Sequence, residues 1–216
     1  MEARDRASAE RTRSLIERGL HAPATFRAAL LEVPALDRDT WLDVVLGPDE
    51  LCDDGHALPR GCVPYLPCAV DALLRVVDQA PVAATDVFVD LGSGTGRALS
   101  FVHLLTGATA IGVEIQPELV RAARARVARL RLPRVTTLEG DATSVTGAAR
   151  AGNVFFLYCP FSGERLARVL CDLERLARER PLRVCAVDLP LPQLSWLVME
   201  PKGWGDLCIF RSSGAA

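Results

Sequence analysis

The sequence predicts an α/β protein with a doubly wound, mostly parallel sheet and helices on both of its faces. From residue 87 onward, short apolar runs typical of buried strands alternate with longer amphipathic stretches typical of helices. A glycine-rich turn at 92–96 joins the first of these strands to the next helix. Two apolar runs near the end, 196–199 and 207–210, are separated by a turn and predict an antiparallel pair. Regular alternation of strands and helices implies parallel strands joined by helical crossovers.

Three short helices are expected in the first part of the chain. One is expected to begin after Ser8, within a polar segment that is rich in arginine. The apolar spacing over 26–33 predicts a second helix, which Pro34 ends. Asp39 or Thr40 is expected to cap a third.

A long irregular connection is predicted over residues 49–67, because this stretch is rich in proline, glycine and aspartate. A loop of this length in a compact domain is usually functional. We therefore expect residues 1–67 to form a helical and loop segment that covers a functional site. Residues 68–216 would form the main domain, beginning with a helix whose apolar face spans 70–77.

The elements of the main domain follow from their apolar patterns. Its first strand covers 87–91 and is apolar except for Asp90. Two later helices are expected to begin at Pro117 and after Ser162, since proline suits the first turn of a helix and serine suits its cap. The other predicted strands cover 109–113, 135–138, 153–158 and 184–189.

The composition excludes several classes of protein. The 216 residues are half apolar, which suits one ordinary domain, and the net charge of −2 gives no general attraction to nucleic acid or anionic membranes. No apolar run is long enough for a membrane span, and the N-terminus lacks the apolar region of a secretory signal. The seven cysteines are odd in number, scattered and never spaced C-x-x-C, so we interpret them as reduced thiols of a cytoplasmic protein. They share no ligand spacing with the three histidines, and no metal site is expected.

The glycine-rich turn carries the clearest signal of a ligand. A strand that passes through glycines into a helix places backbone N–H groups and the positive helix end beside whatever binds there. Gly92, Gly94 and Gly96 form G-x-G-x-G, whereas a dinucleotide fingerprint would place its third glycine where Arg97 stands. Asp90, two residues before the first glycine, would repel a phosphate and attract an amine. An ordinary buried strand followed by a turn is the alternative interpretation.

This pattern resembles motif I of the class I S-adenosylmethionine-dependent methyltransferases. The resemblance implies their strand order, 3-2-1-4-5-7-6, with the last pair antiparallel, and a site at the carboxyl ends of the strands. It also implies that Asp90 lies near the amino group of S-adenosyl-L-methionine and that the turn packs under the methionine part. The turn residues so assigned to the cofactor are Gly92, Ser93, Gly94, Thr95 and Gly96.

Acidic residues end the next two predicted strands as well. Glu114 stands where a carboxylate accepts hydrogen bonds from ribose hydroxyls in nucleotide-binding folds, which alone fits a nicotinamide cofactor equally well. The Gly-Asp-Ala sequence at the end of the third strand is similar to the position that reads the adenine amino group in the methyltransferases. The resemblance therefore assigns Glu114, Ile115, Asp141 and Ala142 to the cofactor.

The end of the irregular connection has a resemblance of its own. Protein-lysine methyltransferases related to the ATP synthase c-subunit enzyme carry Tyr-x-Pro-Ser near the cofactor, just before a helix. Tyr65, Pro67 and Cys68 are similar to this segment, with cysteine in place of serine. The resemblance implies that Tyr65 contacts the cofactor. A loop aromatic that covers the edge of the core is the alternative.

The acceptor is expected at the end of the fourth strand. Methyltransferases acting on planar amines often carry Asp/Asn-Pro-Pro-Tyr/Phe there, and this chain has Tyr158, Cys159, Pro160 and Phe161. Cysteine is a poor hydrogen-bond acceptor, so methylation of nucleobases or glutamine is not favoured. Tyr158 is the catalytic candidate, because its hydroxyl would align an amine; a core tyrosine is the alternative. No carboxylate or histidine base is expected beside these residues.

These observations together predict a methyltransferase that uses S-adenosyl-L-methionine. The expected acceptor is an amine nitrogen, on a protein lysine or on a small amine. A small-molecule methyltransferase and a catalytically inactive adenosylmethionine-binding protein remain the alternatives.

Overall fold

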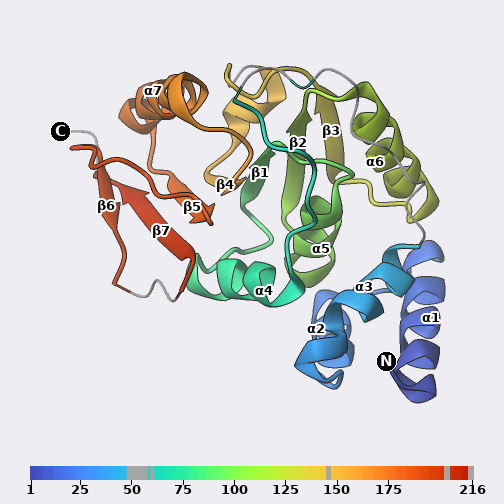
Figure 1. The fold of residues 1–216 in the computed structure, drawn as a ribbon. Helices are drawn as coiled ribbons and strands as arrows, with labels where there is room; N and C mark the ends of the chain where they lie inside the picture. Colours follow the sequence, from blue (N-terminus) through green and yellow to red (C-terminus); the bar gives the residue numbers. More distant parts are fainter. Residues whose placement is uncertain (48–57, 59–60, 145–146, 202–204, 214–216) are drawn as a thin grey trace.

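The computed structural model describes residues 1–47, 58, 61–144, 147–201 and 205–213, and these form a seven-stranded sheet (Figure 1). Its order is β3-β2-β1-β4-β5-β7-β6, with β7 antiparallel to both of its neighbours and the other pairs parallel. The predicted fold class, strand order and antiparallel last pair are therefore confirmed. The strands are β1 (Val87–Leu91), β2 (Thr109–Glu114), β3 (Val135–Glu139), β4 (Val154–Tyr158), β5 (Arg183–Val187), β6 (Leu197–Met199) and β7 (Leu207–Ser212).

Helices precede the sheet and cross between its strands. The N-terminal part holds α1 (Ala3–Glu17), α2 (Pro23–Leu31), the 3₁₀ turn η1 (Ala35–Asp37) and α3 (Arg38–Leu46). The sheet is accompanied by α4 (Val70–Gln79), α5 (Arg97–Thr106), α6 (Pro117–Arg129), the 3₁₀ turn η2 (Gly147–Ala151) and α7 (Gly163–Glu179).

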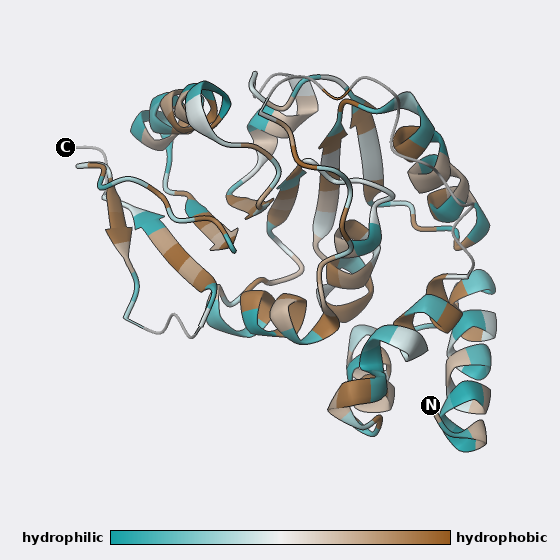
Figure 2. Ribbon diagram, in the orientation of Figure 1, coloured by the Kyte–Doolittle hydropathy of each residue, from teal (hydrophilic) through white to brown (hydrophobic). Residues whose placement is uncertain are grey.

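Alternate residues of the central strands enter two hydrophobic clusters, one on each face of the sheet. Phe88 and Phe156 belong to the cluster that includes α4 and α5, and their stacked rings lie 5.6 Å apart between centroids. Their neighbours Val89 and Phe155 belong to the cluster that includes α7. Figure 2 shows the result as hydrophobic strands between helices whose outer faces are hydrophilic. Because both faces are covered, the strands are apolar throughout, which is why the sequence reveals them.

The N-terminal helices pack against α5. The ring of Phe26 on α2 lies 5.7 Å from Trp41 on α3 and 6.1 Å from Phe101 on α5, measured between centroids. All three side chains are fully buried in the same cluster as α4. The division of the chain at residue 67 stays a prediction.

The first helix begins earlier than expected. It starts at Ala3, so the prediction of a start after Ser8 is wrong. Its polar sequence hides a buried side formed by Ala9 and Ile16, and Arg13 donates a hydrogen bond to the Val45 carbonyl of α3. The helix is therefore stabilised by tertiary contacts that cannot be predicted from the apolar periodicity of its own sequence.

Two expected caps are corrected. Asp39 and Thr40 lie inside α3, which begins at Arg38, and Asp39 instead accepts a hydrogen bond from the backbone N–H of Val70. Ser162 does stand at the N-cap position of α7, but its side chain makes no capping hydrogen bond.

The cysteines within the described residues are free thiols. They are Cys62, Cys68, Cys159, Cys171, Cys185 and Cys208, while Cys52 lies outside the described residues. Among the helices that the structure describes, none is long and apolar enough to cross a membrane.

Candidate active site

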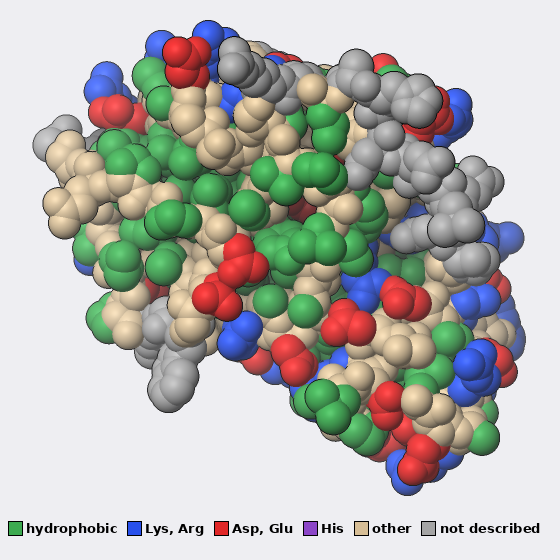
Figure 3. Space-filling view, in the orientation of Figure 1, with side chains coloured by type: hydrophobic (Ala, Val, Ile, Leu, Met, Phe, Trp, Pro, Cys, Tyr) green, Lys and Arg blue, Asp and Glu red, His purple; other side chains and the backbone are tan. Residues whose placement is uncertain are grey.

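A cavity of about 290 Å³ lies at the carboxyl ends of the parallel strands. Figure 3 shows this face of the molecule with hydrophobic side chains around a hollow that contains acidic atoms. This is the edge at which open parallel sheets bind their ligands. Among the residues predicted for the site, the cavity is lined by Tyr65, Gly92, Glu114, Ile115, Asp141, Ala142 and Tyr158.

Glu114 is held in place by the backbone around it. One carboxylate oxygen accepts a hydrogen bond from the N–H of Gly94 at 2.8 Å, and the other accepts one from the N–H of Gln116 at 2.9 Å. The residue is 6% exposed, so both bonds lie in a poorly solvated region. Each carboxylate oxygen has a second lone pair, and a ribose hydroxyl could donate to it.

The glycine-rich turn is packed directly against protein side chains. Gly92, Gly94 and Gly96 all have positive φ angles, of 92°, 53° and 73°, which favour glycine. A Cβ on Gly92 would overlap the side chain of Pro160, and one on Gly94 would overlap the ring of Tyr65. The glycines are thus required by contacts within the chain as well as by the turn itself.

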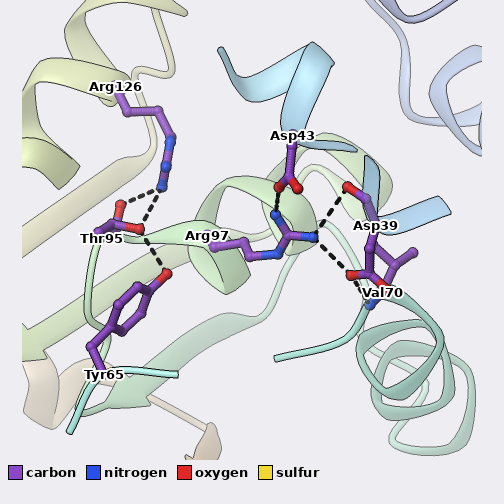
Figure 4. A network of polar contacts seen from close by, with 7 residues as sticks. All are labelled: Asp39, Asp43, Tyr65, Val70, Thr95, Arg97 and Arg126. Atoms are coloured by element: carbon purple, nitrogen blue, oxygen red, sulfur yellow. Dashed lines mark hydrogen bonds and ion pairs between the residues drawn. The ribbon is translucent and has the colours of Figure 1, made fainter. Parts of the chain in front are cut away.

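Tyr65 and Arg126 both hold Thr95 in the middle of this turn (Figure 4). The hydroxyls of Tyr65 and Thr95 lie 2.9 Å apart, and Arg126 donates to the Thr95 carbonyl and hydroxyl. Burial of Arg126, followed by the neighbouring charge of Arg129, lowers its pKa to about 10.

Five of the predicted cofactor residues do not line the cavity. They are Asp90, Ser93, Gly94, Thr95 and Gly96. Two of the five, Gly94 and Thr95, are in contact with Tyr65, which lines the cavity itself.

Asp90 is a buried carboxylate that fits a cationic ligand. It is 4% exposed and accepts no hydrogen bond from the described residues. Burial, and then the negative charge of Glu114, raise its pKa to about 8. A carboxylate in this position is costly to ionise unless a cation accompanies it, and the amino group of S-adenosylmethionine would be such a cation. The carboxylates of Asp90 and Glu114 at the strand ends therefore fit the amino group and the ribose of this cofactor.

Asp141 is engaged by another side chain of the chain. Both of its carboxylate oxygens lie 3.0 Å from Arg165 on α7, and one also accepts the N–H of Thr143 at 2.9 Å. Partial burial alone would raise the pKa of Asp141, but these hydrogen bonds hold it below its usual value. An adenine amino group reaching Asp141 would therefore share the carboxylate with Arg165.

Part of the cavity wall is formed by the exits of β4 and β5. Tyr158 and Phe161, the residues predicted to meet the acceptor, line this part, and Phe161 is 4% exposed. Asp188, directly after β5, lines it too. The expectation that no carboxylate lies beside Tyr158 and Phe161 is therefore wrong. The sequence pattern predicts a strand over 184–189 and so places Asp188 inside it, whereas β5 ends at Val187 and Asp188 directly follows the strand.

The segment 61–67 is here called the cover strand, although it is not one of the seven strands of the sheet. Its backbone is attached to the exit of β4. Val63 donates to the Pro160 carbonyl at 3.1 Å, and Ser162 donates to the Gly61 carbonyl at 3.1 Å. These bonds enclose an isolated antiparallel bridge between Cys62 and Phe161. Of the predicted connection 49–67, residues 49–57, 59 and 60 lie outside the described residues.

A second network, not foreseen from the sequence, joins the glycine-rich turn to α3 (Figure 4). Arg97, the first residue of α5, forms ion pairs with Asp39, at 2.8 Å, and with Asp43. Its side chain is 8% exposed, whereas those of the two acids are 49% and 62% exposed. The position that a dinucleotide fingerprint gives to glycine thus binds the N-terminal helices to the turn.

Comparisons with known proteins agree with this geometry. Residues 88–180 match the methyltransferase domain family. The crystal structure of an RNA methyltransferase from Salinibacter ruber in complex with S-adenosyl-L-homocysteine is similar over 68% of this chain and 92% of that chain, with 23% identity and a TM-score of 0.54. The Escherichia coli protein yhhF is similar over 74% of this chain and 92% of its own, with 19% identity and a TM-score of 0.55. At these sequence identities, the similarity to the two solved structures shows a shared fold and no more. Among curated proteins, none matches the chain in sequence.

Proposed function

We propose that this chain is a class I S-adenosylmethionine-dependent methyltransferase that methylates an amine nitrogen, with the side chain of a protein lysine as the favoured acceptor. The observation that carries the proposal is the placement of Tyr158 and Phe161 in the same cavity as Gly92 and Glu114. One cavity thus joins the residues suited to the cofactor to an aromatic wall suited to an amine.

The cofactor supplies a methyl group on a sulfonium, which is already a good leaving group. The protein has to align the acceptor and exclude water from the reaction. In this proposal Glu114 accepts hydrogen bonds from the ribose hydroxyls, and the carboxylate of Asp90 pairs with the amino group of the cofactor. Phe161 offers an aromatic face to a cationic or methylated amine, which contributes about 0.5–2 kcal/mol.

Tyr158 would align the amine through its hydroxyl. Burial, followed by the electrostatic effect of neighbouring ionisable groups that include Asp188, raises the pKa of Tyr158, so the phenol stays neutral around pH 7. A neutral hydroxyl can accept a hydrogen bond from an N–H of the amine, which leaves the nitrogen lone pair directed elsewhere.

Two features favour a protein acceptor of positive charge. Val63 and Leu66 of the cover strand are 45% and 63% exposed beside the cavity, and they offer apolar contact to a polypeptide around the modified residue. The charged lining is mainly acidic, and Arg165, the lining arginine among the described residues, is paired with Asp141. A phosphate-bearing acceptor would find little compensation there.

Labelling with a radioactive cofactor tests the proposal. The protein is incubated with a cell lysate and methyl-labelled S-adenosylmethionine, and proteins, nucleic acids and small molecules are then separated. We expect label in protein and, after acid hydrolysis, in methylated lysine. Glu114→Ala, which should bind the cofactor poorly, is the control. Label found mainly in nucleic acid, or in none of the fractions, would contradict the proposal.

Tyr158→Phe tests the assigned role of the hydroxyl on the substrate so identified. We expect a loss of turnover with unchanged affinity for S-adenosylhomocysteine. Unchanged turnover would return Tyr158 to a purely structural role in the cavity wall.

A further inference from the structure

Asp188 lies beside Tyr158 at the acceptor end of the cavity. Strands β4 and β5 run parallel, and Tyr158 pairs with Val187 at their carboxyl ends. The residue after Val187 is therefore next to the phenol, and both side chains line the same cavity. The negative charge of Asp188 contributes to the raised pKa of both Tyr158 and Cys68, after the larger effect of burial, which is consistent with this proximity.

The carboxylate of Asp188 is not used by the fold. It forms no hydrogen bond or ion pair within the described part of the chain; its backbone N–H alone is bound, to the Asp206 carbonyl at 2.9 Å. Among the residues that the structure describes, Glu114 and Asp141 are the other acids that line the cavity, and both differ in this respect. Glu114 accepts two backbone N–H groups, and Asp141 is paired with Arg165. Asp188 is thus the lining acid whose charge is left for a ligand.

The backbone presents this carboxylate in an uncommon conformation. Asp188 has a φ of 51°, in the left-handed region where aspartate and asparagine are tolerated better than other residues with a Cβ. The N–H bond to the Asp206 carbonyl fixes the backbone of this turn, and with it the direction of the Cα–Cβ bond of Asp188. An exchange of Asp188 for asparagine would keep this conformation and remove only the charge.

We propose that Asp188 binds the acceptor amine in its ammonium form and holds the nitrogen beside Tyr158, a role that rests on the proposed function. The ammonium gives one proton to solvent, and the resulting lone pair forms the new N–C bond. The C–S bond breaks with its electron pair remaining on sulfur. The positive charge thereby moves from sulfonium to the methylated nitrogen, where Asp188 pairs with it again.

Sinefungin provides a test that needs no knowledge of the acceptor. It resembles S-adenosylmethionine but carries an amine on carbon in place of the methylated sulfonium, so its ammonium points toward the acceptor end of the site. S-adenosylhomocysteine lacks that charge. Calorimetry gives the ratio of the two dissociation constants for the wild-type protein and for Asp188→Asn. We expect Asp188→Asn to lower the preference for sinefungin about fivefold, as for a partly solvated ion pair, and to leave S-adenosylhomocysteine affinity unchanged.

Asp206→Asn is the matched control, because Asp206 is exposed, adjacent and not part of the cavity wall. Its ratio should equal that of the wild type. Binding of both ligands with the same ratio in Asp188→Asn and wild type would overturn the role of Asp188 and leave the proposed function standing. If the wild type bound neither ligand, the proposed function would fail, and this role with it.

Discussion

The hydroxyl of Tyr65 lies 2.9 Å from the hydroxyl of Thr95, so the cover strand is hydrogen-bonded to the glycine-rich turn. The ring of the same tyrosine covers Gly94. One side chain therefore joins the segment before residue 68 to the middle of the glycine-rich turn. Packing of the turn and attachment of the cover strand depend on the same residue.

Tyr65→Phe should loosen the cover strand. It removes the hydrogen bond to Thr95, which costs about 0.5–1.5 kcal/mol of local stability, while Thr95 keeps its contact with Arg126. Hydrogen exchange at the Val63 amide, which is bonded to Pro160, should become faster. In the wild type, S-adenosylhomocysteine should slow this exchange if the cover strand closes on the ligand. Equal exchange with and without ligand would count against closure.

Glu114→Gln should weaken cofactor binding. The carboxylate accepts backbone N–H groups on both oxygens, whereas the amide of glutamine would direct its own N–H groups at one of these donors. We expect calorimetry with S-adenosylhomocysteine to show a loss of about 1–3 kcal/mol. Glu139→Gln is the control, since Glu139 is its register partner on β3 but is exposed. A comparable loss in the control would show that the effect is not specific to Glu114.

Asp90→Asn should change stability and binding in opposite directions. The folded-state pKa of Asp90, about 8, lies above its ordinary value of 3.8. The native state therefore retains a proton that the unfolded state has lost, and stability declines as pH rises from about 4 to 8. Without ligand, Asp90→Asn should melt higher than the wild type at pH 8, and the difference should shrink toward pH 5.

The same substitution should weaken binding of S-adenosylhomocysteine, because the amino group of the ligand loses its anionic partner. In the wild type, affinity should rise with pH as Asp90 ionises. Melting curves at pH 5, 6.5 and 8 with and without ligand separate the two effects. Equal melting temperatures of the wild type and Asp90→Asn at all three pH values would contradict the raised pKa of Asp90.

The ion pair between Arg97 and Asp43 should couple α3 to the turn. A double-mutant cycle with Arg97→Met and Asp43→Asn, measured by urea unfolding, should give a coupling energy of about 1 kcal/mol, since the acid is well exposed. The helical pair Arg178 and Glu174 is the control, and about 0.3–0.5 kcal/mol is expected there. A coupling at Arg97 no larger than that of the control pair would show that this contact does not hold α3.

The fold could be predicted from sequence because its central strands are buried on both faces and its helices show an apolar face. Val87–Leu91 is recognisable for this reason, with Asp90 as its acidic exception. The predicted start of the first helix is wrong because the buried side of the helix consists of isolated residues such as Ala9 and Ile16, which pack against other N-terminal helices. Local pattern alone cannot supply such a partner.

The site was predictable where one residue type at a strand end carries the signal, as with Glu114. The links between distant segments were not. Arg97 and Asp43 are 54 positions apart, and nothing in either neighbourhood indicates the other. Tyr65 was assigned to the cofactor by resemblance, a role that stays a prediction, but its contact with Gly94 follows from the course of the chain through space.

The way in which the cover strand is attached has a consequence for the design of variants. The strand is fastened to the exit of β4 through main-chain groups of Gly61, Val63, Pro160 and Ser162. Main-chain bonds do not depend on which side chain occupies Val63 or Leu66, and both project into solvent near the opening. Under the proposed function, we therefore expect substitutions at these two positions to alter which acceptor is admitted while the strand remains in place. A library restricted to residues 63 and 66 would separate acceptor choice from folding, and it is a compact starting point for redirecting the proposed activity.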